Sequence, residues 1–137
     1  MQNFNMPGIF SRIIVREIPA WIVAEDENHI AFLDINPLMK GHTLVVPKKE
    51  IDYYFDLPQA DFQNLNTFAK KVALSIQAST DCERIGVAIM GLEVPHCHIH
   101  LIPIRTMDDM NFSRPKLKLE KGEFDAIAST IAKHFVA

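Results

Sequence analysis

His96-Cys97-His98-Ile99-His100-Leu101-Ile102 places three histidines at every second position of one short, apolar stretch. On a β-strand successive side chains point to opposite faces, so the three imidazoles would share one face while Cys97, Ile99 and Leu101 face a core. An exposed strand has no physical reason to repeat imidazole, whose proton exchanges near neutral pH. The stretch therefore predicts a row of groups that bind, protonate or attack a ligand.

Length, charge and cysteine content narrow the class of protein. The chain has 137 residues, the usual size of one domain. Its formal net charge of −3 argues against broad nucleic-acid or membrane-surface binding. There is no apolar run of membrane-spanning length and no signal-peptide pattern, and there are only two cysteines, so we expect reduced thiols and a cytoplasmic location.

Hydrophobic periodicity predicts an α+β domain over residues 1–137, with a five-stranded antiparallel sheet, a long central helix and a C-terminal helix. Ser11 is expected to cap a short first helix, and Asp56 the long helix, whose apolar stripe runs from Phe62 to Ile76. Residues 106–137 are a C-terminal extension whose role stays open. The predicted strands cover residues 21–26, 29–34, 42–47, 84–90 and 96–104, and the last helix covers 123–136.

The histidine stretch resembles the His-φ-His-φ-His-φ-φ signature of the histidine triad family, in which φ is an apolar residue. Five more blocks resemble the family's blocks in the same order, and the resemblance covers roughly the first hundred residues. It implies a five-stranded α+β domain, a homodimer with a continuous sheet and no cofactor. It also implies hydrolysis or transfer at the α-phosphate of an AMP-like, purine nucleotide. The additional blocks are residues 8–14, 17–20, 25–26, 31–37 and 41–49.

The same resemblance assigns roles to four histidines. His98 would be the nucleophile, His100 a phosphate contact and His96 a structural hydrogen-bonding partner. His42 matches the family's fourth histidine, which approaches the other three from the neighbouring strand. Neutral imidazole, with an ordinary pKa of about 6.5, can attack phosphorus at neutral pH, and water can then release the phosphoramidate that forms. We therefore expect a covalent His98–nucleotide intermediate.

The resemblance also implies nucleotide contacts. Asp34 matches a carboxylate that binds ribose, which is chemically reasonable because a carboxylate accepts from two adjacent hydroxyls. A loop-stabilising aspartate is the alternative for this position. The apolar walls around the base would be Ile9, Phe10, Phe32 and Ile35.

Some relatives carry a zinc site that this chain lacks the residues to build. Their Cys-x-x-Cys would fall at Gly8 and Ser11, and a further zinc-binding histidine at Glu50. Since the soft thiolate and imidazole ligands are all replaced, we expect no metal.

The loop before the histidines, from Gly91 to Glu93, also departs from the family pattern. Leu92 and Glu93 stand where relatives have glutamine and a hydroxyl residue that donates to phosphate. An ionised Glu93 would repel phosphate at close range. Three outcomes stay open: Glu93 turns away, it is protonated and acts as the general acid, or the substrate differs from that of the relatives.

Two other classes of function remain beside the nucleotide hydrolase or transferase. A nucleotide-binding or interaction protein with weak or no turnover is favoured by the altered phosphate loop. A metalloenzyme is the third, because His-x-His pairs chelate transition metals. It ranks last, since no further ligands complete such a site by spacing.

Overall fold

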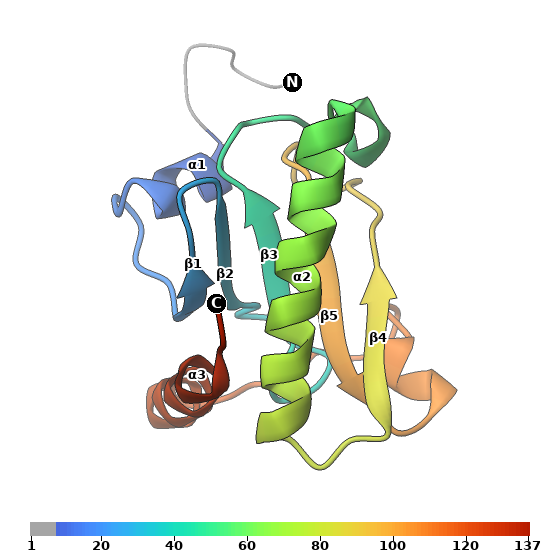
Figure 1. The fold of residues 1–137 in the computed structure, drawn as a ribbon. Coiled ribbons are helices and arrows are strands. Elements are labelled where there is room, and N and C mark those ends of the chain that lie inside the picture. Colours follow the sequence, from blue (N-terminus) through green and yellow to red (C-terminus); the bar gives the residue numbers. More distant parts are fainter. Residues whose placement is uncertain (1–7) are drawn as a thin grey trace.

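Five antiparallel strands form one sheet in the order β1-β2-β3-β5-β4 in the computed structural model, which describes residues 8–137 (Figure 1). The predicted α+β architecture, including the meander of the first three strands, is confirmed. Most strands are one or two residues shorter than predicted. Their bounds are β1 Ile22–Glu25, β2 His29–Leu33, β3 Thr43–Pro47, β4 Arg84–Ala88 and β5 Ile99–Ile104.

The described chain also contains three α-helices, α1 Ile9–Ile14, α2 Gln59–Ser79 and α3 Lys121–His134. Short 3-10 helices cover Tyr54–Asp56 and Met107–Met110. None of the helices in residues 8–137 has the length and apolar character needed to cross a bilayer.

Both predicted helix caps are wrong. Ser11 lies inside α1, which begins one turn earlier and has Gly8 as its N-cap, because Phe10 must be helical to share a buried face with Ile13. Asp56 ends a 3-10 helix, and Pro58 is the N-cap of α2, its carbonyl accepting from the Phe62 N–H at 2.9 Å.

One face of the sheet is covered by α2, with α3 beside it (Figure 1). The long helix buries Leu65, Phe68, Val72 and Ile76 against strand residues such as Val45, as its three- and four-residue spacing predicts. In α3 the buried residues Phe124, Ala128 and Ile131 extend the same core.

The opposite face is covered less completely. The six-residue helix α1 packs Phe10 and Ile13 against Phe32 of β2 and Leu44 of β3, in a smaller apolar cluster. Such a short helix cannot span the sheet, so part of this face remains open. The histidines lie on this face, because Leu44 and His100 are direct partners across β3 and β5.

Candidate active site

Strand β5 begins at Ile99, three residues later than predicted, so His96 and His98 precede it. The cause is local pairing: the Cys97 N–H donates to the Ile51 carbonyl at 2.7 Å rather than to β3. The chain is nevertheless extended enough to preserve the alternation. Cys97, Ile99 and Leu101 are buried in the larger core, and the imidazoles face the other side.

An open pocket of about 420 Å³ lies on the histidine face. It is lined by ten residues that the sequence analysis assigned to the site: Ile9, Phe10, Phe32, Asp34, Ile35, His42, Gly91, Glu93, His98 and His100. His96 does not line it. That ring lies behind the Phe10 ring, with centroids 5.7 Å apart in an edge-to-face arrangement.

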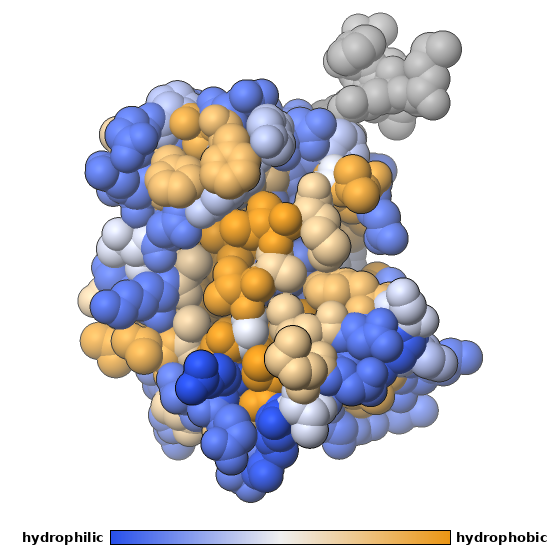
Figure 2. All heavy atoms as spheres, turned by 90° about the vertical axis from the view of Figure 1, so that its right-hand side faces the viewer, coloured by the Kyte–Doolittle hydropathy of each residue, from blue (hydrophilic) through white to orange (hydrophobic). Residues whose placement is uncertain are grey.

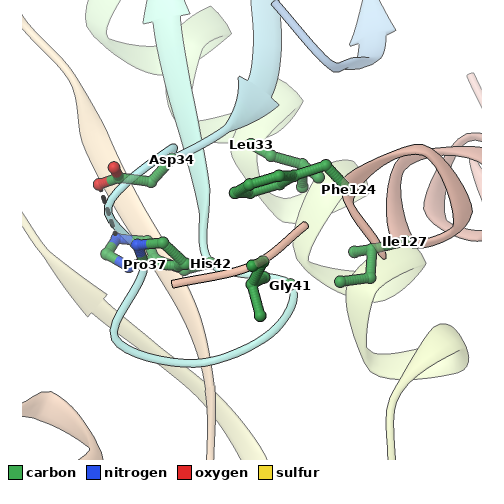
Figure 3. A pocket seen from close by; sticks show the side chains of 8 residues that line it. Leu33, Asp34, Pro37, Gly41, His42, Phe124 and Ile127 are labelled. Carbon is green, nitrogen blue, oxygen red and sulfur yellow. Dashed lines mark ion pairs between the residues drawn. The ribbon is translucent and has the colours of Figure 1, made fainter. Parts of the chain in front are cut away.

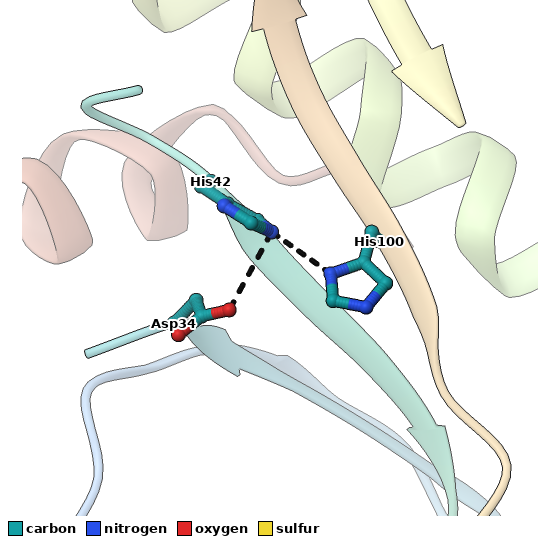
Figure 4. Close-up of side chains that lie close together, drawn as sticks. All are labelled: Asp34, His42 and His100. Atoms are coloured by element: carbon teal, nitrogen blue, oxygen red, sulfur yellow. Dashed lines mark hydrogen bonds and ion pairs between the residues drawn. The ribbon is translucent and has the colours of Figure 1, made fainter. Parts of the chain in front are cut away.

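His42 and His100 form a hydrogen-bonded pair whose tautomers are set by the backbone (Figure 4). The Leu38 N–H donates to His42 Nδ1 at 3.0 Å, so this nitrogen carries no proton. Neutral His42 therefore holds its proton on Nε2 and donates it to His100 Nδ1 at 2.9 Å. Neutral His100 must then carry its own proton on Nε2, which makes it a donor for a ligand in the pocket.

Burial keeps both rings of this pair neutral. It lowers the pKa of His42 to about 3, with a further lowering by His100. It also lowers the pKa of His100 to about 4, with His98 adding to the effect. At neutral pH His100 therefore offers a neutral N–H donor and not a positive charge.

His98 is held by its own chain in the tautomer that a nucleophile needs. Its Nδ1–H donates to the His96 carbonyl at 2.7 Å. In the neutral ring this leaves the lone pair on Nε2. The Phe10 ring packs edge-on against the imidazole at 5.1 Å between centroids, so the ring orientation is fixed from both sides.

His96 behaves as a structural residue. Its Nε2–H donates to the Pro47 carbonyl at 2.7 Å, and burial lowers its pKa. Its Nδ1 is buried and has no hydrogen-bond partner. The ring therefore ties the lead-in of β5 to the end of β3 and positions the carbonyl that orients His98.

Asp34 follows β2 directly and lies between the pocket and His42. Its Oδ1 accepts from the Asn36 N–H at 2.8 Å, and its Oδ2 lies 3.5 Å from His42 Nε2. Burial raises the pKa of its carboxyl group, and the Asn36 hydrogen bond opposes this. One carboxylate oxygen is thus used to shape the loop, and the other remains available to a ligand hydroxyl.

The back of this loop is supported by the C-terminal helix. Figure 3 shows Phe124 of α3 lying beside Leu33, with Ile127 on the same side of the pocket and Asp34 on the other side, next to His42. Gly41 has φ +98°, a conformation that strains any residue with a Cβ, and it turns the chain into His42.

The altered loop places Gly91 and Glu93 at the pocket. Gly91 has φ +73°, which again favours glycine, and the side chain of Glu93 is largely exposed at the wall. Leu92 is 92% exposed, at the outer edge of the pocket.

Twelve further residues line the pocket that the sequence analysis did not assign to the site, and Phe112 and Lys116 are two of them. The Phe112 ring lies edge-on to His100, with centroids 5.1 Å apart, and 6.3 Å from the His42 ring. Both residues belong to an irregular segment beyond the resemblance, and no period or motif marks them.

Two residue sets are the candidates for holding a metal ion. Asp34, His42 and His100 have ligand atoms within 4.8 Å of one another, but the His42 and His100 nitrogens that face each other already share a proton. At the position of the relatives' zinc site, the Gly8 N–H donates to Glu50 Oε1 at 3.2 Å, and no thiol is present. Neither set fits a resident zinc ion.

Known proteins share much of this sequence. The sequence model of the HIT domain matches residues 15–107. An uncharacterized HIT-like protein of Methanocaldococcus jannaschii is 43% identical over 102 residues, covering 69% of this chain and 77% of that protein. Adenosine 5'-monophosphoramidase of Saccharomyces cerevisiae is 36% identical over 98 residues, covering 71% of this chain and 62% of the yeast protein.

Solved structures give the same result. The crystal structure of a hypothetical histidine triad nucleotide-binding protein from Sulfolobus tokodaii has a TM-score of 0.78 and 29% identity, covering 91% of this chain and 89% of that one. A HIT-like protein from Bartonella henselae has a TM-score of 0.80 and 27% identity, covering 93% and 96%.

Proposed function

Because this chain belongs to the HIT domain family, which the match over residues 15–107 establishes, we propose that it is a nucleotide hydrolase or nucleotidyl transferase. It acts at the α-phosphate of a purine nucleotide derivative such as an adenosine phosphoramidate or a dinucleoside polyphosphate. The observation that carries the proposal is the tautomer of His98, whose Nδ1–H is held by the His96 carbonyl so that Nε2 keeps its lone pair beside an open pocket.

The reaction takes two displacements at phosphorus. In the first, the lone pair of His98 Nε2 forms a P–N bond while the bond from phosphorus to the leaving group breaks. In the second, water attacks the same phosphorus and the P–N bond breaks, which restores His98. Overall the hydroxyl of water goes to phosphorus and its proton to the leaving group; in a transferase, another nucleophile takes the place of water.

The surrounding residues supply binding and charge stabilisation. The Nε2–H of His100 donates to an equatorial phosphate oxygen as charge develops there. Asp34 accepts from the ribose hydroxyls, and the apolar side chains of Ile9, Phe10 and Phe32 enclose the base. The yeast relative's name, a monophosphoramidase acting on an adenosine 5'-derivative, supports this class of substrate.

Intact-protein mass spectrometry tests the proposal. Wild-type protein mixed with adenosine phosphoramidates and dinucleoside polyphosphates should gain the mass of one nucleotidyl group, and peptide mapping should locate that group on His98. The variant His98→Ala should not gain it, whereas the exposed helix variant His134→Ala should react like wild type. Absence of both adduct and turnover with every substrate would overturn the proposal.

A binding protein with weak turnover is the second candidate, and one observation favours it. Glu93 places a carboxylate at the pocket where relatives have a hydroxyl donor. Tight nucleotide binding without a His98 adduct would select this function. Turnover that is lost with chelators and has no His98 adduct would instead select a metalloenzyme.

We also propose a homodimer formed through the free edge of β4. Among the described strands β4 pairs only with β5, and Figure 2 shows an apolar stripe on this side of the molecule. Val87 of β4 is 59% exposed and Leu74 of α2 is 57% exposed. Light scattering should give twice the chain mass for wild type and a lower mass for Val87→Lys; a wild-type monomer would refute the dimer.

A cytoplasmic location is proposed from the thiols. Cys82 and Cys97 are both free, and burial raises the pKa of Cys97 to about 11, which makes its thiol unreactive. Free, structural thiols are typical of a reducing compartment.

A further inference from the structure

The geometry points to Lys116 as the cation that binds the phosphate group in this pocket, delivered by the C-terminal segment 111–118. This inference rests on the proposed function and concerns a residue outside the part of the chain that the HIT domain model matches. It also assigns a role to the C-terminal extension, namely completion of the nucleotide site.

The charge of the pocket lining calls for such a group. Among the described residues that line the pocket, Asp34 and Glu93 are acidic, and Lys116 is the single lysine or arginine. His42 and His100 supply no positive charge at neutral pH, because burial keeps them neutral. A phosphate group carrying one or two negative charges would therefore be repelled by the lining without the ammonium group of Lys116.

The segment that carries Lys116 is anchored on both sides of it. Arg114 Nη2 donates to the Leu38 carbonyl at 2.7 Å, and the Leu117 N–H donates to the Pro37 carbonyl at 2.8 Å. The same loop supplies the Leu38 N–H that orients His42. Lys116 is thus fixed to the loop that sets the histidine tautomers, and Phe112 of the same segment packs on the His100 ring.

The ammonium group itself is positioned but not neutralised. Lys116 Nζ donates to the carbonyls of Phe112 at 2.5 Å and Arg114 at 3.3 Å, and within residues 8–137 it forms no ion pair with a carboxylate. An ammonium group has three N–H donors, so one remains for a ligand. Burial dominates the pKa of both Asp34 and His42, and the Lys116 charge acts on both as well, in keeping with its place at the pocket.

A comparison of AMP with adenosine isolates the phosphate contact. We expect wild type to bind AMP more tightly than adenosine, and Lys116→Met to weaken AMP binding by about tenfold or more, the usual worth of a charge-assisted hydrogen bond. Adenosine binding should change by less than about twofold, because Met keeps the packing volume but removes the charge. The AMP affinity of the variant should also depend less on salt concentration.

Two further variants separate charge from structure. Lys116→Arg should retain most of the AMP affinity, and Lys118→Met, an exposed lysine two residues along, should match wild type. Isothermal titration calorimetry gives the affinities, and thermal unfolding verifies that each variant is folded.

Three results would overturn the inference: equal affinity of wild type for AMP and adenosine, unchanged AMP binding in folded Lys116→Met, or equal losses for both ligands. Each can be told apart from failure of the proposed function, which is read from the His98 adduct. If the His98 adduct forms but Lys116→Met binds AMP as wild type does, the proposed function holds and the inference about Lys116 fails. If AMP is preferred through Lys116 but no adduct forms, the inference holds and the proposed function fails.

Discussion

The two faces of the sheet are built from the same strands but differ in how they are covered. One face, the closed face, meets α2 and α3, whose apolar side chains pack over it in the larger core. The other meets only the six-residue α1, and a pocket of about 420 Å³ remains between the helix, the loops and the strands. Because side chains alternate, Ile99 of β5 belongs to the closed face, whereas its neighbours His98 and His100 belong to the open one.

Because of this difference, side chains on one face contribute mainly to the stability of the fold, and side chains on the other face contribute mainly to the chemistry of the site. The closed face buries apolar side chains that have no polar atoms to satisfy, so its contribution is packing. The open face buries imidazoles that are held by hydrogen bonds to backbone groups or to another ring, so its contribution is orientation. The neighbouring positions His98 and Ile99 should therefore respond to mutation in different ways.

The largest effect is expected on the open face. His98→Asn should lower turnover by at least about 10³-fold, because the amide cannot form the covalent intermediate. Its thermal unfolding temperature should stay close to that of wild type, since the side chain lines the pocket. Steady-state assays of His98→Asn, with His134→Asn as the control, check this. Turnover of His98→Asn near the wild-type rate would contradict the assignment of the chemistry to the open face.

The second-largest effect is a loss of stability expected on the closed face. Ile99→Ala should lower the free energy of unfolding by about 2–5 kcal/mol, because it leaves a cavity in a core where Ile99 is 1% exposed. Urea unfolding measures this loss. The activity per folded molecule should change little, and a selective loss of activity at unchanged stability would contradict the assignment.

Acid should lower the free energy of unfolding through the buried histidines of the open face. The pKa values of His42 and His100 fall from 6.5 to about 3 and about 4 in the folded protein, so below pH 6.5 the unfolded chain binds more protons than the folded one. The contribution of these two rings to stability is therefore complete above pH 6.5 and declines as the pH falls toward 4, by about 1 kcal/mol per pH unit for each ring.

Urea unfolding at a series of pH values measures this decline. His100→Asn removes one of the two rings and should make the decline shallower. Equal slopes for wild type and variant would show that these histidines are not the groups responsible.

The smallest expected effect concerns the altered loop. Glu93→Ser removes a carboxylate from the pocket and should tighten AMP binding by about fivefold, since partly exposed charges interact by about 1 kcal/mol. Glu27→Ser, at the exposed β1–β2 turn, is the matched control. No gain in affinity or turnover would mean that Glu93 does not oppose the phosphate.

Much of this molecule could be predicted from local patterns. The alternation of His96 to Leu101 requires only extended backbone, and it placed the imidazoles on the face opposite Ile99 even though β5 begins later than expected. The spacing of the α2 stripe likewise predicts its buried face. Caps were less predictable, because Ser11 and Asp56 satisfy a local rule that packing of Phe10 and the Pro58 turn override.

The faces on which the side chains of β5 and α2 lie were thus decided by sequence periodicity, which depends on backbone geometry alone. The protonation pattern was decided by tertiary structure. His100 takes its tautomer from His42, 58 positions away, and His96 takes its tautomer from the Pro47 carbonyl, 49 positions away. Lys116 reaches the pocket only because its segment hydrogen-bonds to the Pro37–Leu38 loop, and contacts between segments so far apart leave no periodic trace in the chain.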